Sequence, residues 1–241
     1  METEIVNIPE VKQKLILKLE GTGWFEKLRL FLRSSDFNIL LEKLAEDREK
    51  GYRFTPPLAV VFRPFQLCHY KDTRVVFLVD EPHIFTARAD GLCFSSAGTS
   101  HRKTFSNILA YIFKEIKKTV YPEQEYKNNQ DLSRWAMQGI LMLNCTLTTR
   151  MRIHKKHIEI WRPFMNYLIE VLNQMSDEII FVFFGEADEW ADNITGNKRK
   201  FFVSHPDKTI PFEKTKNWDS RGIFNKINLI LKENGKSEIK W

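Results

Sequence analysis

The chain has 241 residues, which is enough for one α/β domain with a full hydrophobic core. Its composition, with 43% hydrophobic residues and only 10 glycines and 9 prolines, argues against a fibrous or disordered chain. No run approaches the roughly 18 apolar residues of a membrane span, and the N-terminal segment lacks the apolar core of a secretory signal. We therefore expect a soluble, cytoplasmic protein without membrane contact.

The net charge indicates what kind of partner the chain binds, and the spacing of its cysteines indicates whether it holds a metal. The formal net charge of +6 favours a polyanionic partner. Cys68, Cys93 and Cys145 are widely separated and show no C-x-x-C spacing. We therefore expect three buried, reduced thiols, no metal site and no cofactor.

The first part of the chain, residues 1–53, is predicted to be helical. Apolar residues recur there at mixed spacings of three and four, from Leu28 to Leu44. Ser34–Asp36 predicts a break and an N-cap between two helices. Gly51–Pro57 predicts a loop, because its two prolines cannot continue a helix.

The rest of the chain alternates between helix patterns and short apolar runs. Amphipathic periodicity predicts helices at Phe105–Val120, His157–Met175 and Ile223–Glu233, and a polar loop at Glu123–Asp131. Apolar runs predict strands at Val75–Val79, Ile140–Leu143, Glu178–Phe184 and Phe201–Val203, and the absence of alternation in the first predicts a strand buried on both faces. The alternation predicts a single α/β domain over residues 1–241, with three α/β/α layers around a four-stranded parallel sheet.

Polar residues follow each predicted strand. Asp80 and Glu81 come after the first, Asn144 after the second, Glu186 after the third and His205 after the fourth. Ligands of such folds bind beyond the carboxyl ends of the strands. Carboxylate, amide and imidazole groups at one edge indicate an active site. A solvated acidic turn is the alternative interpretation of Asp80 and Glu81 taken alone.

Four motifs carry a resemblance to a known family. Val79–Ile84 reads VDEPHI, and G-L-C-F-S follows at Gly91–Ser95. Trp135–Arg150 reads WAMQGILMLNCTLTTR, and His205–Ile210 reads HPDKTI. Over roughly residues 54–241 the chain resembles the family 1 uracil-DNA glycosylases, whose motifs are GQDPYH, G-L-x-F-S, W-x-x-Q-G-V-L-L-L-N-x-x-L-T-V-R and H-P-S-P-L-S. Their closing pattern reappears as Phe224, Asn228, Ile239 and Trp241.

The resemblance implies a monofunctional DNA glycosylase, which flips a pyrimidine out of DNA and hydrolyses its N-glycosidic bond. Glu81 takes the place of the family's water-activating aspartate, and Asp80 is the second candidate. His205 matches the histidine that donates to O2 of the leaving base. Asn144 matches the amide that pairs with the base edge, and Phe94 matches the ring that stacks on the flipped base.

Departures from the family pattern gather around the base pocket. His83 stands where the family has a tyrosine that walls off C5 of the base. Because an imidazole is shorter than a phenol, we expect uracil or a C5-modified pyrimidine as substrate, and phage DNA, in which such bases occur, as one setting. The alternative is an inactive DNA-binding protein on the same scaffold. Loss of the GQDPYH consensus favours that alternative, whereas the retained carboxylates, His205 and Asn144 favour an enzyme.

Basic residues follow two of the predicted strands. Arg150, Lys155 and Lys156 come after the second strand, and Lys208 comes after the fourth. We predict that these four contact DNA phosphates, and we expect Lys198–Lys200 near the same edge. Each basic segment, taken alone, could equally be a solvent-exposed surface that binds no ligand. Their agreement in place with the catalytic candidates predicts binding to double- or single-stranded DNA. We further expect a monomer.

Overall fold

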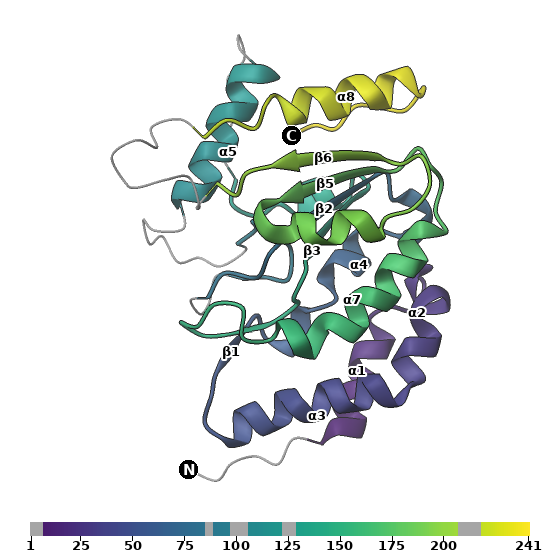
Figure 1. The fold of residues 1–241 in the computed structure, drawn as a ribbon, viewed down its shortest axis with the longest axis vertical. Coiled ribbons are helices and arrows are strands. Elements are labelled where there is room, and N and C mark those ends of the chain that lie inside the picture. Colours follow the sequence, from purple (N-terminus) through teal and green to yellow (C-terminus); the bar gives the residue numbers. More distant parts are fainter. Residues whose placement is uncertain (1–6, 85–88, 97–105, 122–128, 207–217) are drawn as a thin grey trace.

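A parallel sheet of four strands forms the centre of the fold (Figure 1). The computed structural model describes residues 7–84, 89–96, 106–121, 129–206 and 218–241. The strand order is β3-β2-β5-β6, and all three pairings are parallel. The strands are β2 (Val75–Val79), β3 (Ile140–Asn144), β5 (Ile180–Phe184) and β6 (Arg199–Val203).

Side chains of the central strands fill two hydrophobic clusters, one on each face of the sheet. In β2, Val76 and Leu78 belong to one cluster, whereas Val75, Phe77 and Val79 belong to the other. Successive side chains of a strand point to opposite faces, so a run without polar residues requires both faces to be covered. Every residue of β2, β3 and β5 is buried.

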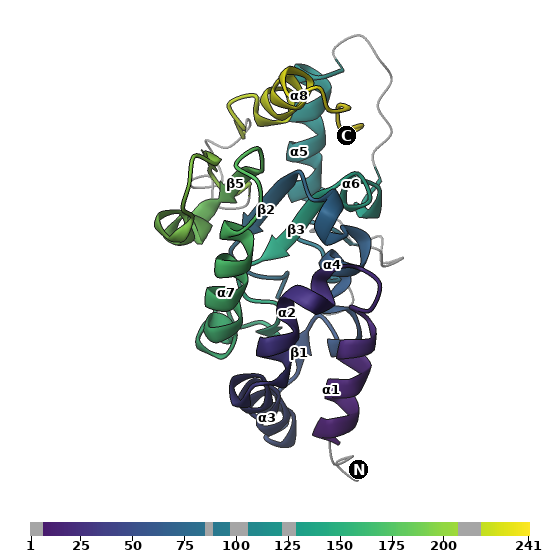
Figure 2. The same cartoon turned by 90° about the vertical axis from the view of Figure 1, so that its right-hand side faces the viewer.

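Helices cover both faces of the sheet, and the fold therefore has the three α/β/α layers predicted from the sequence. Figure 2 shows α5 and α8 on one side of the sheet, and α2, α3 and α7 on the other. The first side holds α5 (Ser106–Thr119), α6 (Ser133–Ala136) and α8 (Ile223–Glu233). The second holds α1 (Ile8–Leu17), α2 (Trp24–Arg33), α3 (Ser35–Glu49), α4 (Arg63–Leu67) and α7 (Ile158–Asn173).

The N-terminal helices pack into the same hydrophobic cluster as one face of the sheet. Ser34 ends α2 and caps α3, because its hydroxyl accepts a hydrogen bond from the backbone N–H of Phe37 at 3.3 Å. The break predicted at Ser34–Asp36 is thereby confirmed. Trp24, Leu28 and Phe37 are buried with the sheet side chains, so the helices within residues 7–53 extend the core.

One predicted loop contains a strand. β1 (Phe54–Thr55) pairs antiparallel with β4 (Thr149–Arg150), although the sequence predicts a loop over Gly51–Pro57. A two-residue strand is too short for a periodic pattern, and a partner nearly a hundred residues away creates it. Short 3-10 helices complete the described elements, at η1 (Leu58–Val60), η2 (Tyr70–Asp72) and η3 (Gly185–Asn193). The predicted polar loop lies partly outside the described residues.

The expected position of the basic segment at residues 198–200 is wrong. β6 begins at Arg199, so this segment lies at the amino end of the strand, whereas His205 follows its carboxyl end. Lys198 donates to the carbonyl of Asn173 at 3.1 Å. Lys200 donates to two carbonyls that end η3, at 2.8 and 2.7 Å. These lysines therefore bind backbone at the edge opposite the site.

Within the described ranges, no helix is both long and apolar enough to cross a membrane.

Candidate active site

The carboxyl ends of all four parallel strands lie level with one another. Val79, the last residue of β2, is in register with Asn144 on one side and Phe184 on the other, and Phe184 is in register with Val203. Level strand ends bring the loops that follow them to one edge of the sheet. The chain thus delivers residues far apart in sequence to one place.

A cavity of about 470 Å³ opens at this edge. Its lining includes all six residues that the sequence singled out as catalytic or base-binding, namely Asp80, Glu81, His83, Phe94, Asn144 and His205. His154, Lys155 and Glu186 also line it. The volume falls in the range of small-molecule binding pockets, and the lining offers several polar groups.

Both carboxylate oxygens of Glu81 are held by the loop between β4 and α7. Oε1 lies 2.6 Å from Nδ1 of His154, and Oε2 accepts a hydrogen bond from the backbone N–H of Lys155 at 2.7 Å. The Glu81 side chain is 10% exposed, whereas that of His154 is 73% exposed. The carboxylate is therefore fixed inside the cavity by partners at its rim.

The loop at residues 151–157 is shaped by two strained residues. Arg152 and Lys155 have φ angles of 63° and 56°, in the left-handed region that residues other than glycine seldom adopt. The backbone N–H of Arg152 donates to the carbonyl of Ile84 at 2.8 Å, and the Lys155 ammonium pairs with the Glu186 carboxylate. The loop thereby bridges the segments that follow β2 and β5.

Phe94 enters the cavity from a tight turn. Its φ is 62°, and its ring lies edge-on to Phe184 at 5.0 Å between centroids and 5.7 Å from the His205 ring. Gly91 starts this turn with φ 97°, and a Cβ there would lie 2.0 Å from the carbonyl oxygen of Val60. Only glycine fits this close approach.

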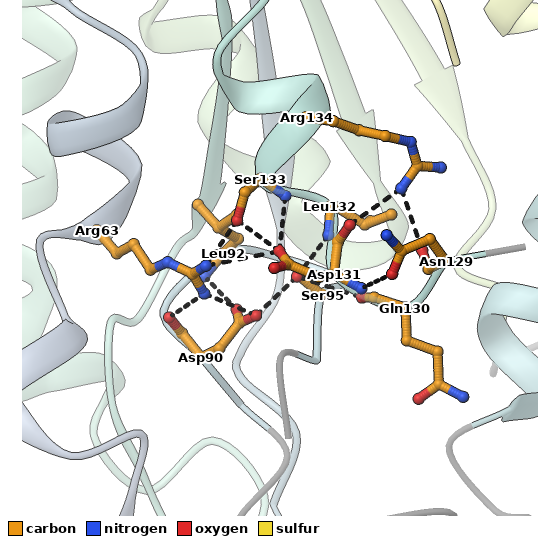
Figure 3. Close-up of polar contacts among 10 residues, drawn as sticks. All are labelled: Arg63, Asp90, Leu92, Ser95, Asn129, Gln130, Asp131, Leu132, Ser133 and Arg134. Atoms are coloured by element: carbon orange, nitrogen blue, oxygen red, sulfur yellow. Dashed lines mark hydrogen bonds and ion pairs between the residues drawn. The ribbon is translucent and has the colours of Figure 1, made fainter. Parts of the chain in front are cut away.

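A buried aspartate, Asp90, holds the turn together (Figure 3). Its Oδ1 accepts from the backbone N–H of Leu92 at 3.1 Å, and its Oδ2 accepts from the Ser95 hydroxyl at 2.8 Å. Oδ2 also pairs with Nη1 of Arg63 at 2.8 Å. One carboxylate thus binds the backbone before Phe94 and the side chain that follows it.

Arg63 links this turn to the residues before α6 (Figure 3). Its Nη2 donates to the Ser133 hydroxyl at 2.6 Å and lies 3.5 Å from Oδ1 of Asp131. Burial works to raise the pKa of Asp131, but hydrogen bonds from Ser133 and the charges of Arg63 and Arg134 outweigh it and lower that pKa below 3.8. Asp131 therefore stays ionised.

Gly185 separates two of the candidate groups. It has φ 65°, and a Cβ there would lie 3.0 Å from Cβ of His205 and 3.1 Å from Oδ2 of Asp80. A larger residue would press on both. The strand end before His205 is held by Trp218, whose Nε1 donates to the carbonyl of Ser204 at 2.9 Å.

Arg150, which the sequence predicts to contact phosphate, is held by an aspartate of α3. Its guanidinium donates to both carboxylate oxygens of Asp47, at 2.6 and 2.5 Å, and lies 3.7 Å from the Tyr52 ring centroid. This bidentate pair uses Nε and Nη2 and fixes the side chain against α3. Lys156 is exposed, and Lys208 lies outside the described residues.

The same aspartate binds a buried histidine. His157 Nε2 lies 2.9 Å from Oδ2 of Asp47, and its Nδ1 lies 2.8 Å from the Thr148 hydroxyl. The hydrogen bond from Arg150 lowers the pKa of Asp47 below 3.8. Burial lowers the pKa of His157 below 6.5, against the opposing effect of its bond to Asp47. Helix α3 is thereby joined to the loop that holds Glu81.

The described residues contain no group of three or more His, Cys, Asp or Glu side chains that could hold a metal ion. Cys68, Cys93 and Cys145 are free thiols. Burial raises the pKa of Cys68 to about 12, and it raises the pKa values of Cys93 and Cys145 well above 9.0. The thiols are therefore protonated and unreactive at neutral pH.

No protein-family model matches the chain. A uracil-DNA glycosylase of Mesomycoplasma hyopneumoniae (strain 7448) is 35% identical over 208 residues, which cover 85% of this chain and 90% of that protein. This chain belongs to the uracil-DNA glycosylase family. The human uracil-DNA glycosylase is 31% identical over 225 residues, covering 92% of this chain and 69% of that protein.

Solved structures agree on the fold of this uracil-DNA glycosylase family member. The crystal structure of mimivirus uracil-DNA glycosylase aligns with a TM-score of 0.80 at 23% identity, covering 97% of this chain and 91% of that chain. The three-layer α/β/α prediction is therefore confirmed twice, by the sheet itself and by this likeness.

Sequence reasoning missed two groups of the site. His154 sits inside a basic run that was interpreted as a phosphate contact, and nothing in its spacing indicates a partner 73 residues away. Asp90 precedes the G-L-C-F-S motif, yet its ion pair with Arg63 joins positions 27 residues apart. Only a tertiary structure could connect either pair.

Proposed function

We propose that this chain is a monofunctional DNA glycosylase that flips uracil out of DNA and hydrolyses its N-glycosidic bond. The observation that carries the proposal is the cavity of about 470 Å³ at the carboxyl edge of the sheet, which is lined by carboxylates, an amide, three imidazoles and an aromatic ring. One chain supplies all of these groups, which supports action as a monomer. DNA is the partner, as the family membership and the net charge of +6 indicate.

Glu81 is the proposed carboxylate of the reaction. Cleavage of the N-glycosidic bond develops oxocarbenium character on the sugar, and a carboxylate facing that sugar stabilises the charge and orients the attacking water. Two donors fix the Glu81 carboxylate, so it needs little reorganisation when the charge develops. Asp80 lines the same cavity one residue earlier and is the second candidate.

His205 is proposed to assist departure of the base. A ring N–H aimed at O2 of the leaving uracil would stabilise the negative charge that develops there. The position of this imidazole beside the Phe94 ring, at 5.7 Å between centroids, supports the role. A base stacked on Phe94 would then lie within reach of His205.

Asn144 and Phe94 are proposed to recognise the flipped base. An amide carries both a donor and an acceptor, so Asn144 can pair with the N3–H and O4 edge of uracil. Asn144 is 3% exposed, and water therefore competes little for that edge. Phe94, held in place by its turn, offers a ring face for stacking.

His83 is proposed to set selectivity at C5 of the base. Its imidazole lines the cavity together with Val79 and Ile84. A phenol there would close the space next to C5, whereas this shorter ring leaves part of it open. The proposal extends the substrate range to C5-substituted pyrimidines, which would fit a role against modified phage DNA.

Arg150, Lys155 and Lys156 are the proposed phosphate contacts among the described residues. Lys156 is exposed, and Lys155 reaches the cavity rim beside Glu186. Phosphate contacts of this kind make binding weaken steeply as salt is added.

The experiment that tests the proposal incubates the purified chain with labelled oligonucleotides carrying one uracil, in single- and double-stranded form. Alkali then cleaves the strand wherever a base has been released. We expect cleavage at uracil and none at cytosine. Tight binding without base release would instead favour the inactive DNA-binding protein.

A further inference from the structure

Two hydrogen bonds hold the carboxylate of Glu81 in one position. A glutamate carboxylate has three rotatable side-chain bonds, so unless it is held it samples many positions. Here one oxygen contacts Nδ1 of His154 at 2.6 Å, and the other contacts the Lys155 amide at 2.7 Å. Each oxygen keeps a second lone-pair direction that can face a water molecule.

The two hydrogen-bond partners of Glu81 differ in how far they depend on the identity of the residue. The Lys155 amide is backbone, so any side chain at that position could supply it. The His154 contact depends on one side chain that is 73% exposed and lies on a loop held by the Lys155–Glu186 pair. Holding this exposed imidazole against Glu81 costs side-chain conformational entropy, which the hydrogen bond to the carboxylate must offset.

We propose that His154 is a positioning residue for the catalytic carboxylate, a role that rests on the proposed function of Glu81. The imidazole donates its Nδ1 hydrogen to Oε1 and selects the one arrangement of the long glutamate arm in which the carboxylate faces the cavity. A glutamate is one methylene longer than an aspartate, about 1.5 Å, so its carboxylate needs this extra anchor.

The direct test is a set of variants measured in single-turnover reactions on uracil-containing duplex. His154→Ala should lower the cleavage rate about tenfold or more, with KM within about threefold of wild type, because attack geometry changes while DNA contacts remain. His154→Asn should restore most of the rate, since its amide nitrogen can occupy the place of Nδ1. Ile153→Ala is the matched control, because this exposed neighbour does not line the cavity.

A shorter carboxylate provides a second, independent comparison. In a Glu81→Asp background the carboxylate no longer reaches His154, so His154→Ala should change the remaining rate by less than about twofold. If the two substitutions instead multiply their effects, His154 does not act through Glu81. Wild-type turnover by His154→Ala, or a loss expressed only in KM, would also overturn the proposal.

Imidazole nitrogen NMR keeps the test separate from activity. The ¹⁵N shifts of the His154 ring report which nitrogen carries and donates the hydrogen. They should change in Glu81→Gln and stay the same in Asp80→Asn. Unchanged shifts in Glu81→Gln would show that the contact does not exist in solution. If the shifts behave as expected but no uracil is released by wild type, the proposed function fails while the contact stands.

Discussion

At the scale of single residues, the site combines groups that the chain places at level strand ends. Asn144 ends β3, and Glu81 and His205 follow β2 and β6 within two residues. The position of each along the sequence is sufficient to place it at the cavity. Its detailed partners are set by loops, as the contact between His154 and Glu81 shows.

Replacement of Glu81 by glutamine should abolish base release while DNA affinity stays within about threefold. The charge acts on the sugar in the transition state, so its removal lowers turnover by about a hundredfold or more and leaves binding nearly intact. Single-turnover rates and fluorescence anisotropy measure the two effects. Asp80→Asn is the matched comparison, and a large loss in Asp80→Asn with little loss in Glu81→Gln would assign the reaction to Asp80.

Replacement of His83 by tyrosine should remove activity on C5-substituted pyrimidines before it removes activity on uracil. A phenol fills space next to C5, and steric exclusion requires such a wall. A panel of oligonucleotides with uracil, thymine and 5-hydroxymethylated pyrimidines measures the ratio of rates. Wild-type activity on uracil alone, unchanged by the substitution, would show that another residue closes C5.

At the scale of elements, apolar runs were sufficient to predict the central sheet and amphipathic periodicity to predict its main helices. α8 begins and ends where its periodicity predicts, at Ile223 and Glu233. Loops and short strands were harder, because their partners lie far away along the chain. β1 exists only through its pairing with β4, and Arg150 is held by Asp47, 103 residues earlier.

The turn that carries Phe94 is the element whose shape depends on one buried charge. Asp90→Asn removes the ion pair with Arg63 and weakens the bond to Ser95, and it should lower the free energy of unfolding by about 1–3 kcal/mol. Uracil release should fall as well, since the Phe94 ring loses its fixed position. Urea denaturation and single-turnover rates measure both.

An exposed ion pair serves as the control for this prediction. Glu159 pairs with Arg162 at 3.1 Å on the surface of α7, with side chains 78% and 40% exposed. Glu159→Gln should leave stability almost unchanged, because solvent screens such pairs. Equal effects of the two substitutions would mean that the Asp90 pair does not stabilise the turn.

At the scale of the whole molecule, the N-terminal helices support the site from behind. Asp47 on α3 binds Arg150 on β4 and His157 at the start of α7, and both flank the loop that holds Glu81. No residue of α1, α2 or α3 lines the cavity. The helices therefore contribute to the reaction through the loop they hold.

This junction should make stability fall with acid in the range just below pH 6.5. The pKa of His157 is lowered by burial, so the unfolded chain takes up a proton before the folded protein does, and stability decreases as pH falls from about 6.5. Asp47, whose pKa is lowered below 3.8, adds a further loss only in stronger acid. Melting temperatures from pH 8 to pH 5 measure the first effect.

The variant His157→Asn, whose side chain cannot titrate in this range, isolates the contribution of His157 to the loss of stability in acid. Its melting temperature starts lower, because a buried group is replaced, but it should change less between pH 6.5 and pH 5 than that of wild type. Glu159→Gln should keep the wild-type slope. A slope in His157→Asn equal to that of wild type would show that other groups cause the acid sensitivity.

The residue at position 185 should differ between related chains that release bases and those that do not. A Cβ at position 185 would lie 3.0 Å from Cβ of His205 and 3.1 Å from Oδ2 of Asp80, so a side chain there would press on both. A descendant that kept DNA binding but abandoned base release would no longer need that gap. Among homologues, an alanine or serine at position 185 would therefore mark lineages that are no longer selected for base release. This would hold even where all the catalytic side chains are retained.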